Sequence, residues 1–155
     1  MSQVASINLD NIPEWISQPQ PGAEPLAQMQ HIINQVLPGT LGVIITELNE
    51  DEVWGEIAFK PATANALGIL HGGSIFTLGD TLTGCLLWYK EILAVTASSE
   101  IKYIRPTSEG KVTCHARILK REGKRIKMVC DFYNAGKKRV ARMKINYAEI
   151  DSVAP

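Results

Sequence analysis

Alternation with a period of two residues dominates the second half of the chain. Apolar side chains recur at alternate positions in four segments, which cover 94–106, 111–121, 125–134 and 139–150. Because successive side chains of a strand point to opposite faces, this period predicts four strands. Earlier in the chain, two runs of β-favouring residues at 41–48 and 53–60 flank an acidic turn and predict a β-hairpin.

Helical spacing appears in two places. Between Leu26 and Leu37 the apolar residues recur every three or four positions, and Pro38-Gly39 is expected to end that helix. A second helix is predicted from about residue 73 to residue 90, and it is apolar on nearly all sides. One stripe of it should pack on a concave sheet, formed by Ile75, Leu78, Leu82, Leu86 and Tyr89.

The order of these elements predicts an α+β domain. One helix, two strands, a long buried helix and four strands give an antiparallel sheet of five or six strands around one central helix. The other side of that helix needs a second apolar surface, which another subunit would supply. Residues 1–25 hold four prolines and are expected to form an N-terminal arm, with Trp15 packed on a single domain of residues 26–155.

Composition is typical of one soluble globular domain, with 155 residues of which 45% are hydrophobic and 21% charged. No apolar run reaches the roughly 20 residues of a membrane span, and the first residues lack the basic and apolar regions of a secretory signal. Cys85, Cys114 and Cys130 are spaced for neither zinc nor a disulfide framework. We therefore expect buried reduced thiols, no metal site and a cytoplasmic protein.

Charge is distributed unevenly along the chain. Residues 1–100 carry two basic and eleven acidic side chains, whereas residues 101–155 carry fourteen basic and five acidic ones. Solvated outer strand faces explain this asymmetry as well as an anionic partner does, such as a phosphate-bearing cofactor, an acidic carrier protein or nucleic acid. Nucleic acid is disfavoured, because the four strands offer few exposed aromatic rings for bases to stack on.

One carboxylate lies on the apolar helix. Asp80 is the only charged residue between Ser74 and Tyr89. Burying an unpaired carboxylate is costly, so it must be hydrogen-bonded, protonated or close to solvent. It lies too far inside the helix to cap its start. Thr77, Thr83 or a partner chain could satisfy it in a purely structural role.

The start of the same helix carries two glycines after His71. Free N–H groups and the positive end of the helix dipole at Gly72-Gly73 would stabilise a carbonyl oxygen that gains negative charge. Together with a carboxylate two turns further on, such donors suit acyl transfer. The alternatives are that Gly72-Gly73 form only a tight turn and that His71 has only a structural, hydrogen-bonding role. Gly84, one turn beyond Asp80, should leave room beside the carboxylate.

The sequence "HGGSIFTLGD", residues 71–80, resembles the H-G-G-x(4)-L-x-D signature of hotdog-fold acyl-CoA thioesterases of the phenylacetyl-CoA thioesterase type. The strand block after residue 101 is also similar to this family. The hairpin and the helix end "GCLLWY" resemble the thioesterase-like YiiD C-terminal domain. The resemblance covers residues 37–150, with Gly79 at a position where the family commonly has alanine.

This resemblance implies a hotdog fold and a homodimer, often a dimer of dimers, with active sites between subunits. It implies that Asp80 attacks the thioester or activates water, that the Gly73 N–H polarises the carbonyl, and that His71 orients these groups. It implies no cofactor apart from CoA as part of the substrate.

We therefore expect hydrolysis of an acyl thioester, carried on CoA or on a carrier protein, with Thr83 assisting Asp80. The residues expected to bind substrate are Gly72 and Ser74 at the helix start and, for the CoA phosphates, Arg105, Lys124 and Arg125. A non-catalytic acyl-CoA or acyl-carrier binding module is the main alternative. A hydratase would need an Asp/His or His/Glu arrangement that the motif does not supply.

Overall fold

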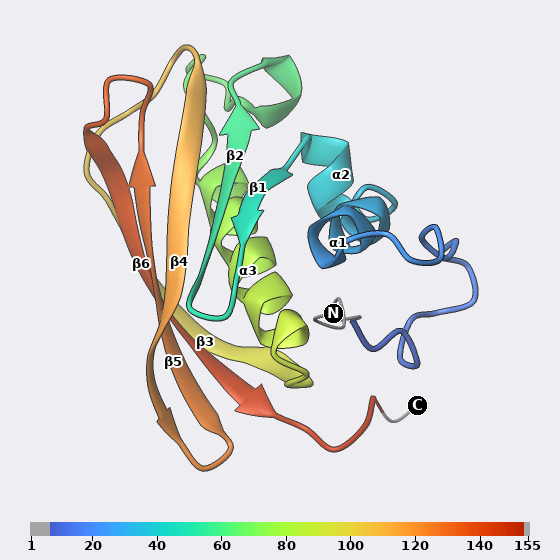
Figure 1. The fold of residues 1–155 in the computed structure, drawn as a ribbon. Coiled ribbons are helices and arrows are strands. Elements are labelled where there is room, and N and C mark those ends of the chain that lie inside the picture. The colour runs from blue at the N-terminus through green and yellow to red at the C-terminus, as the bar shows by residue number, and fades with distance from the viewer. Residues whose placement is uncertain (1–6, 154–155) are drawn as a thin grey trace.

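An antiparallel sheet curves around one long helix in the computed structural model, which describes residues 7–153 (Figure 1). The strand order is β1-β2-β4-β5-β6-β3, and every neighbouring pair is antiparallel. The strands are β1 (Ile44–Leu48), β2 (Glu52–Ala58), β3 (Ala94–Tyr103), β4 (Lys111–Glu122), β5 (Arg125–Tyr133) and β6 (Arg139–Glu149). The α+β architecture expected from the sequence is confirmed.

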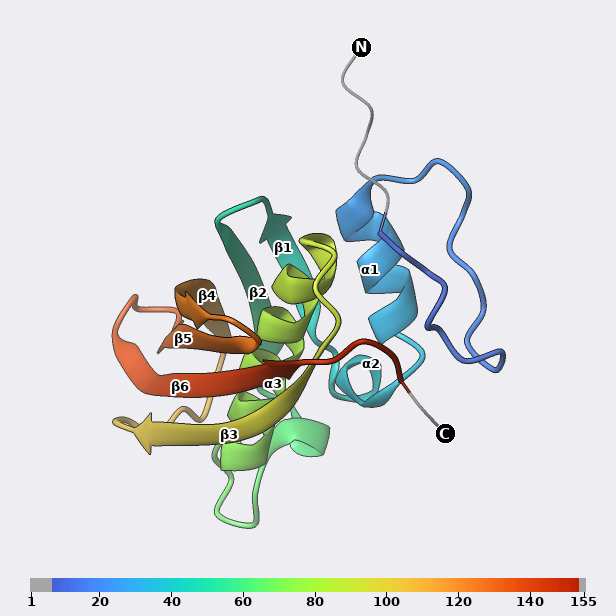
Figure 2. The same ribbon diagram turned by 90° about the horizontal axis from the view of Figure 1, so that it is seen from below.

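Helix α3 (Gly72–Tyr89) lies in the concave side of the sheet, and the smaller helices α1 (Pro25–Ile33) and α2 (Leu37–Leu41) lie on its other side (Figure 2). The predicted stripe faces the sheet, since Leu78, Leu82 and Leu86 are fully buried. Gly79 allows the close approach of helix and sheet. A Cβ at this position would lie 2.7 Å from Phe132 Cζ and would overlap Met143 Cε.

The prediction for the first helix is wrong at its C-terminal end. Helix α1 stops at Ile33, and a separate helix, α2, begins at Leu37. Pro38 occupies the first turn of α2, where a missing N–H and a fixed φ are favourable, so it starts a helix rather than ending one. Gly42, with a φ of 78°, ends α2 and delays the hairpin, whose first strand begins at Ile44 instead of residue 41.

The arm is attached differently from the prediction. Trp15, expected to pack on the domain, is 72% exposed, whereas Ile7 and Ile16 are buried in the core. The anchoring tryptophan comes from α3 instead, because Trp88 Nε1 donates a 2.7 Å hydrogen bond to the Asn8 carbonyl. The arm thus covers part of the side of α3 for which the sequence predicted a second subunit, at the C-terminal half of the helix. The domain boundary at residue 25 stays a prediction.

Strand β3 ends one side of the sheet. It pairs with β6 alone, although β4 follows it in the chain. Most of its side chains are exposed, among them Val95 and Tyr103. An edge strand presents unpaired backbone donors and acceptors, so β3 is a surface on which another strand can pair.

The three cysteines are buried and free, as expected. Burial raises the pKa of the Cys85 thiol to about 12, which leaves it protonated and unreactive at neutral pH. Among residues 7–153, no helix is long and apolar enough to cross a membrane.

Candidate functional site

The first turn of α3 carries its own cap. His71 precedes the helix, and its Nδ1 accepts a 2.8 Å hydrogen bond from the Gly73 N–H. In a neutral imidazole the proton then resides on Nε2. Both residues are exposed. The Gly73 N–H, which the sequence analysis expected to stabilise an oxyanion, is therefore accessible to a ligand. In this structure it donates its hydrogen bond to His71.

The other two predicted substrate contacts at this turn have structural partners. The Gly72 carbonyl accepts a 2.8 Å hydrogen bond from the Tyr103 hydroxyl, and a Cβ at position 72 would lie 3.0 Å from that ring. Ser74 is buried, and its Oγ donates to the Thr63 carbonyl at 3.0 Å. Gly72 thus lets β3 approach the helix, and Ser74 ties the helix to the preceding loop.

Asp80 is half-buried and is held from two strands. Thr96 Oγ1 of β3 donates to its Oδ1 at 2.7 Å, and the Tyr147 hydroxyl of β6 lies 3.3 Å from the same oxygen. No group in residues 7–153 donates to Oδ2. An ionised carboxylate has about four acceptor sites, so one oxygen is anchored and the other is free to take a proton or to attack.

Thr77 and Thr83 do not bind this carboxylate, so these two partners suggested from the sequence are wrong, and a contact from a partner chain stays a prediction. Thr77 Oγ1 donates to the Gly73 carbonyl and Thr83 Oγ1 to the Gly79 carbonyl, each at 2.8 Å. Thr83 is fully buried and lies 2.8 Å from the Tyr147 hydroxyl. It therefore lies behind Asp80, where it can orient Tyr147.

The Tyr147 hydroxyl contacts Asp80 twice, since its oxygen lies 3.0 Å from the main-chain carbonyl and 3.3 Å from Oδ1 of the carboxylate. Burial and, second, the negative charge of Asp80 raise the pKa of the Tyr147 hydroxyl above its ordinary value. It keeps its proton throughout the neutral range. The sequence predicted that Tyr147 lies on the inner face of its strand, but it did not connect Tyr147 or Thr96 to Asp80. The alternation of apolar and polar residues shows which face a side chain takes and does not show which strands pair.

The two halves of the predicted site lie far apart on one helix. Gly73 and Asp80 are separated by seven residues, which at ~1.5 Å of rise per residue is about 10 Å along the axis. A reacting carbonyl must approach both the donor and the attacking group to about 3 Å. One chain alone cannot place both groups on the same carbonyl.

The predicted phosphate contacts are not brought together. Arg105 follows the end of β3 and lines a cavity of about 380 Å³ beside Gly72. Lys124 and Arg125 lie at the β4–β5 turn, level with Val95 at the other end of β3. At ~3.3 Å per residue, the ten residues from Val95 to Arg105 span about 30 Å.

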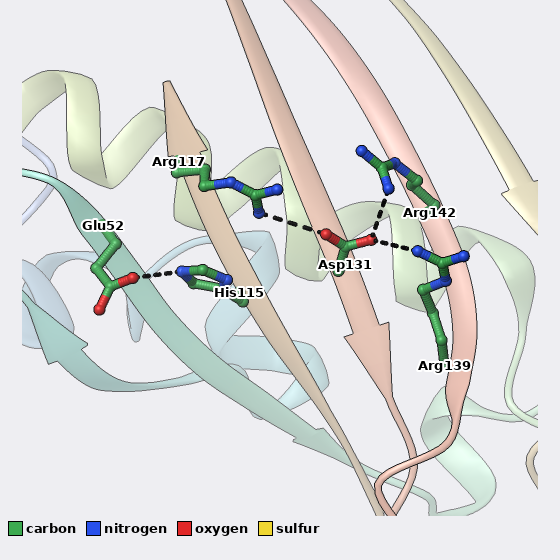
Figure 3. Close-up of polar contacts among 6 residues, drawn as sticks. All are labelled: Glu52, His115, Arg117, Asp131, Arg139 and Arg142. Atoms are coloured by element: carbon green, nitrogen blue, oxygen red, sulfur yellow. Dashed lines mark hydrogen bonds and ion pairs between the residues drawn. The ribbon is translucent and has the colours of Figure 1, made fainter. Parts of the chain in front are cut away.

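The outer face of the sheet holds the other charged clusters (Figure 3). Asp131 points away from α3, yet its side chain is only 7% exposed, because Arg117, Arg139 and Arg142 surround it. Glu52 contacts His115 across β2 and β4. Strand pairing also joins an acid of the first half to a base of the second, since Glu56 of β2 lies 2.9 Å from Lys111 of β4. This His/Glu pair lies on the face opposite Asp80.

Residues 67–141 match the sequence model of the thioesterase superfamily, and this span contains the motif and most of the sheet. The resemblance to the hotdog-fold thioesterase superfamily is confirmed. Conserved protein PA5202 of Pseudomonas aeruginosa is 25% identical, with a TM-score of 0.66 over 71% of this chain and 90% of that one. The PaaI protein of the Escherichia coli phenylacetic acid degradation operon is 21% identical, with a TM-score of 0.73 over 83% and 95%.

A third structure of the same fold is smu.793 of Streptococcus mutans, bound to acetyl CoA. It is 21% identical, with a TM-score of 0.68 over 72% of this chain and 90% of that one. The family match supports thioester hydrolysis as the class of activity. Within the part of the chain that the structure describes, no cluster of three His, Cys, Asp or Glu side chains could hold a metal ion.

Proposed function

We propose that the protein is a thioesterase that hydrolyses an acyl-CoA or acyl-carrier thioester to a free acid and a thiol. The observation that carries this proposal is the state of the Asp80 carboxylate. Thr96 fixes Oδ1 with a 2.7 Å hydrogen bond, whereas Oδ2 has no donor within residues 7–153 and lies on a half-exposed helix face. A group held by one oxygen and free at the other is pre-organised to act on a substrate.

In the reaction, Asp80 takes a proton from water, and the resulting hydroxide attacks the thioester carbonyl carbon. The carbon–sulfur bond then breaks, and the leaving thiolate takes up the proton. Direct attack by Oδ2, with hydrolysis of the mixed anhydride, is the other course. Single turnover in ¹⁸O-labelled water separates the two, since only direct attack incorporates the label into Asp80 or carries unlabelled oxygen into the first product.

The site is completed between two copies of the chain. Because Gly73 and Asp80 of one helix are about 10 Å apart along its axis, Asp80 would work with Gly73 of the partner subunit. An antiparallel meeting of two α3 helices about a twofold axis provides this pairing twice. The exposed edge of β3, with Val95 46% exposed, lies beside the same helix face and is available to the second copy.

The oxyanion would be stabilised by the Gly73 N–H at the positive end of α3. That N–H is bonded to His71 Nδ1, so the substrate oxygen would replace the imidazole. We assign His71 the role of holding the donor in place until substrate binds.

Acyl-CoA is the favoured substrate, since the Streptococcus mutans relative was solved with acetyl CoA. The cavity at the start of α3 offers this chain two groups for such a ligand. One is the Arg105 guanidinium, which suits a phosphate. The other is Thr107 Oγ1, the buried side-chain oxygen without a hydrogen-bond partner in residues 7–153.

The test is hydrolysis of a panel of acyl-CoAs by the wild type and by Asp80→Asn, followed through release of the free thiol. The matched control is Asp51→Asn, the same change at an exposed turn. We expect Asp80→Asn to lose at least 100-fold in kcat and the control to lose nothing. A folded Asp80→Asn protein with full activity would refute the assignment.

The bond between His71 and Gly73 favours a second candidate, a non-catalytic acyl-CoA or acyl-carrier binding module. In that case acyl-CoA would raise the thermal unfolding temperature while no thiol is released. The same panel therefore distinguishes the two functions.

A further inference from the structure

An apolar cavity of about 330 Å³ lies between α3 and the N-terminal arm. Its lining includes Gly84 and Trp88 of the helix, Ile12 of the arm and Ala94 at the start of β3. Figures 1 and 2 show the arm beside the helices that flank α3. The cavity lies within the size range of small-molecule sites, at its lower end.

The cavity continues the surface that holds Asp80. Asp80, Gly84 and Trp88 follow one another at intervals of four residues, so they lie along one face of α3. On β3, Ala94 and Thr96 are two residues apart and share a face. The helix and the strand that position the carboxylate therefore also line the cavity, α3 beyond Asp80 and β3 before Thr96.

We propose that this cavity binds the acyl group of the substrate and that the N-terminal arm is its outer wall. The inference rests on the proposed function, because it takes the thioester carbonyl to lie at Asp80. Gly84 is then the passage from the carboxylate to the cavity. A Cβ at this position would meet only the Tyr147 hydroxyl, at 3.7 Å, so the absent side chain leaves open space toward the acyl group.

The dimensions select the acyl class. A volume of about 330 Å³ holds roughly eleven atoms of water size, at ~30 Å³ each. Eight residues of helix separate Asp80 from Trp88, or about 12 Å. Both limits suit a straight acyl chain of about eight carbons, such as octanoyl. No lysine, arginine or histidine of the described chain lines the cavity, so an acyl group that ends in a carboxylate is disfavoured.

The family match does not account for this cavity. The arm lies outside residues 67–141, which carry the match to the thioesterase superfamily. The arm is nevertheless fixed, since Ile16 is buried and Trp88 is hydrogen-bonded to Asn8. It can therefore set an acyl preference that belongs to this chain.

The first experiment fills the cavity from the helix. Activity on acetyl-CoA and octanoyl-CoA is compared for the wild type, Gly84→Ala and Gly84→Leu, with thermal unfolding as the check on folding. We expect the ratio of kcat/KM for octanoyl over acetyl to fall at least tenfold in Gly84→Leu, with Gly84→Ala in between. A folded Gly84→Leu protein with an unchanged ratio would overturn the inference.

The second experiment tests the arm. Ile12→Ala enlarges the cavity, whereas Trp15→Ala removes a side chain that is 72% exposed and does not line it. Ile12→Ala should shift the preferred acyl group from eight carbons to longer chains, and Trp15→Ala should leave the profile unchanged. If neither variant shifts the profile, the arm is no part of the acyl site.

Binding separates this inference from the proposed function. Asp80→Asn is titrated calorimetrically with acetyl-CoA and octanoyl-CoA, with and without Gly84→Leu. Tighter binding of octanoyl-CoA that Gly84→Leu abolishes supports the cavity even if the wild type releases no thiol. Equal affinities for the two esters would refute the cavity even if the wild type is an active thioesterase.

Discussion

Gly79→Ala should fail to give the stability that helix propensity alone predicts. Alanine is favoured over glycine inside a helix by about 1 kcal/mol. A Cβ at position 79, however, would lie 2.7 Å from Phe132 Cζ, 3.5 Å from Cys130 Sγ and in overlap with Met143 Cε, all of them fully buried. Overpacking of this kind costs about 1–3 kcal/mol. The expected net change lies between no gain and a loss of about 2 kcal/mol.

The matched control is Gly84→Ala on the same helix. Its Cβ would meet one atom, the Tyr147 hydroxyl, at the ordinary contact distance of 3.7 Å. Here the gain in propensity of about 1 kcal/mol should appear almost in full. Urea unfolding at one fixed protein concentration measures both variants, and the Gly84→Ala protein should be the more stable by about 1–3 kcal/mol.

Equal stabilisation of both variants would refute the reasoning, because it would mean that α3 is not pressed against the sheet at Gly79. A double-mutant cycle adds a second criterion. Gly79→Ala and Met143→Ala should be coupled by at least about 0.5 kcal/mol, since removing the Met143 side chain relieves the overlap. Additive effects would contradict the contact.

Three further predictions follow from the same structure. Tyr147→Phe should reduce the loss of stability at alkaline pH. Because the pKa of Tyr147 is raised in the folded protein, the stability that its protonated hydroxyl contributes is complete below the ordinary tyrosine pKa of about 10 and is lost as pH rises above that value. Urea unfolding at two pH values on either side of that value tests this, and equal losses with and without the hydroxyl would contradict it. Asp131→Asn should cost about 1–3 kcal/mol, because three arginines lie 3.3–3.6 Å from a side chain that is 7% exposed. Asp151→Asn, at a pair whose carboxylate is 89% exposed, should change nothing measurable in the same assay. Val95→Lys on β3 should weaken the proposed dimer in light scattering, whereas Leu119→Lys, 58% exposed on β4, should not.

The sequence predicts the strands and the long helix because their patterns are local. Val112, Cys114 and Ala116 alternate with polar residues, and each of them is buried as the period requires. The stripe on α3 follows equally from spacing alone. Where a pattern has two local interpretations the prediction fails. Pro38 can end one helix or begin the next, and only the packed chain shows that it begins α2.

Pairings between distant segments could not be read from the chain. Strand β3 leaves its neighbour β4 and pairs with β6 at the far edge of the sheet, and this pairing alone brings Thr96 and Tyr147 to one oxygen of Asp80. The arm shows the same difficulty. Nothing local decides between Trp15 and Ile16, but a turn from Pro13 to Ile16 turns the isoleucine inward and leaves the tryptophan in solvent.

The two carboxylate oxygens of Asp80 differ, because Oδ1 accepts a hydrogen bond and Oδ2 accepts none within residues 7–153. This difference lets experiment separate the structural role of Asp80 from its chemical role. The Thr96 hydroxyl donates to Oδ1 at 2.7 Å, and the Tyr147 hydroxyl makes only a longer contact of 3.3 Å with the same oxygen. An asparagine oxygen can keep both of these contacts. Asp80→Asn should therefore keep the fold within about 1 kcal/mol, since only the charge-assisted part of these bonds is lost. Asp80→Ala instead removes the acceptor of the Thr96 hydroxyl, whereas Tyr147 keeps the main-chain carbonyl of residue 80. The variant should cost about 1.5–3 kcal/mol, the range for a hydrogen bond to a charged group. If activity falls equally in both variants while stability falls only in the alanine variant, the lost activity belongs to the free oxygen. If stability and activity fall together in both, Asp80 holds the helix to the sheet and does nothing more.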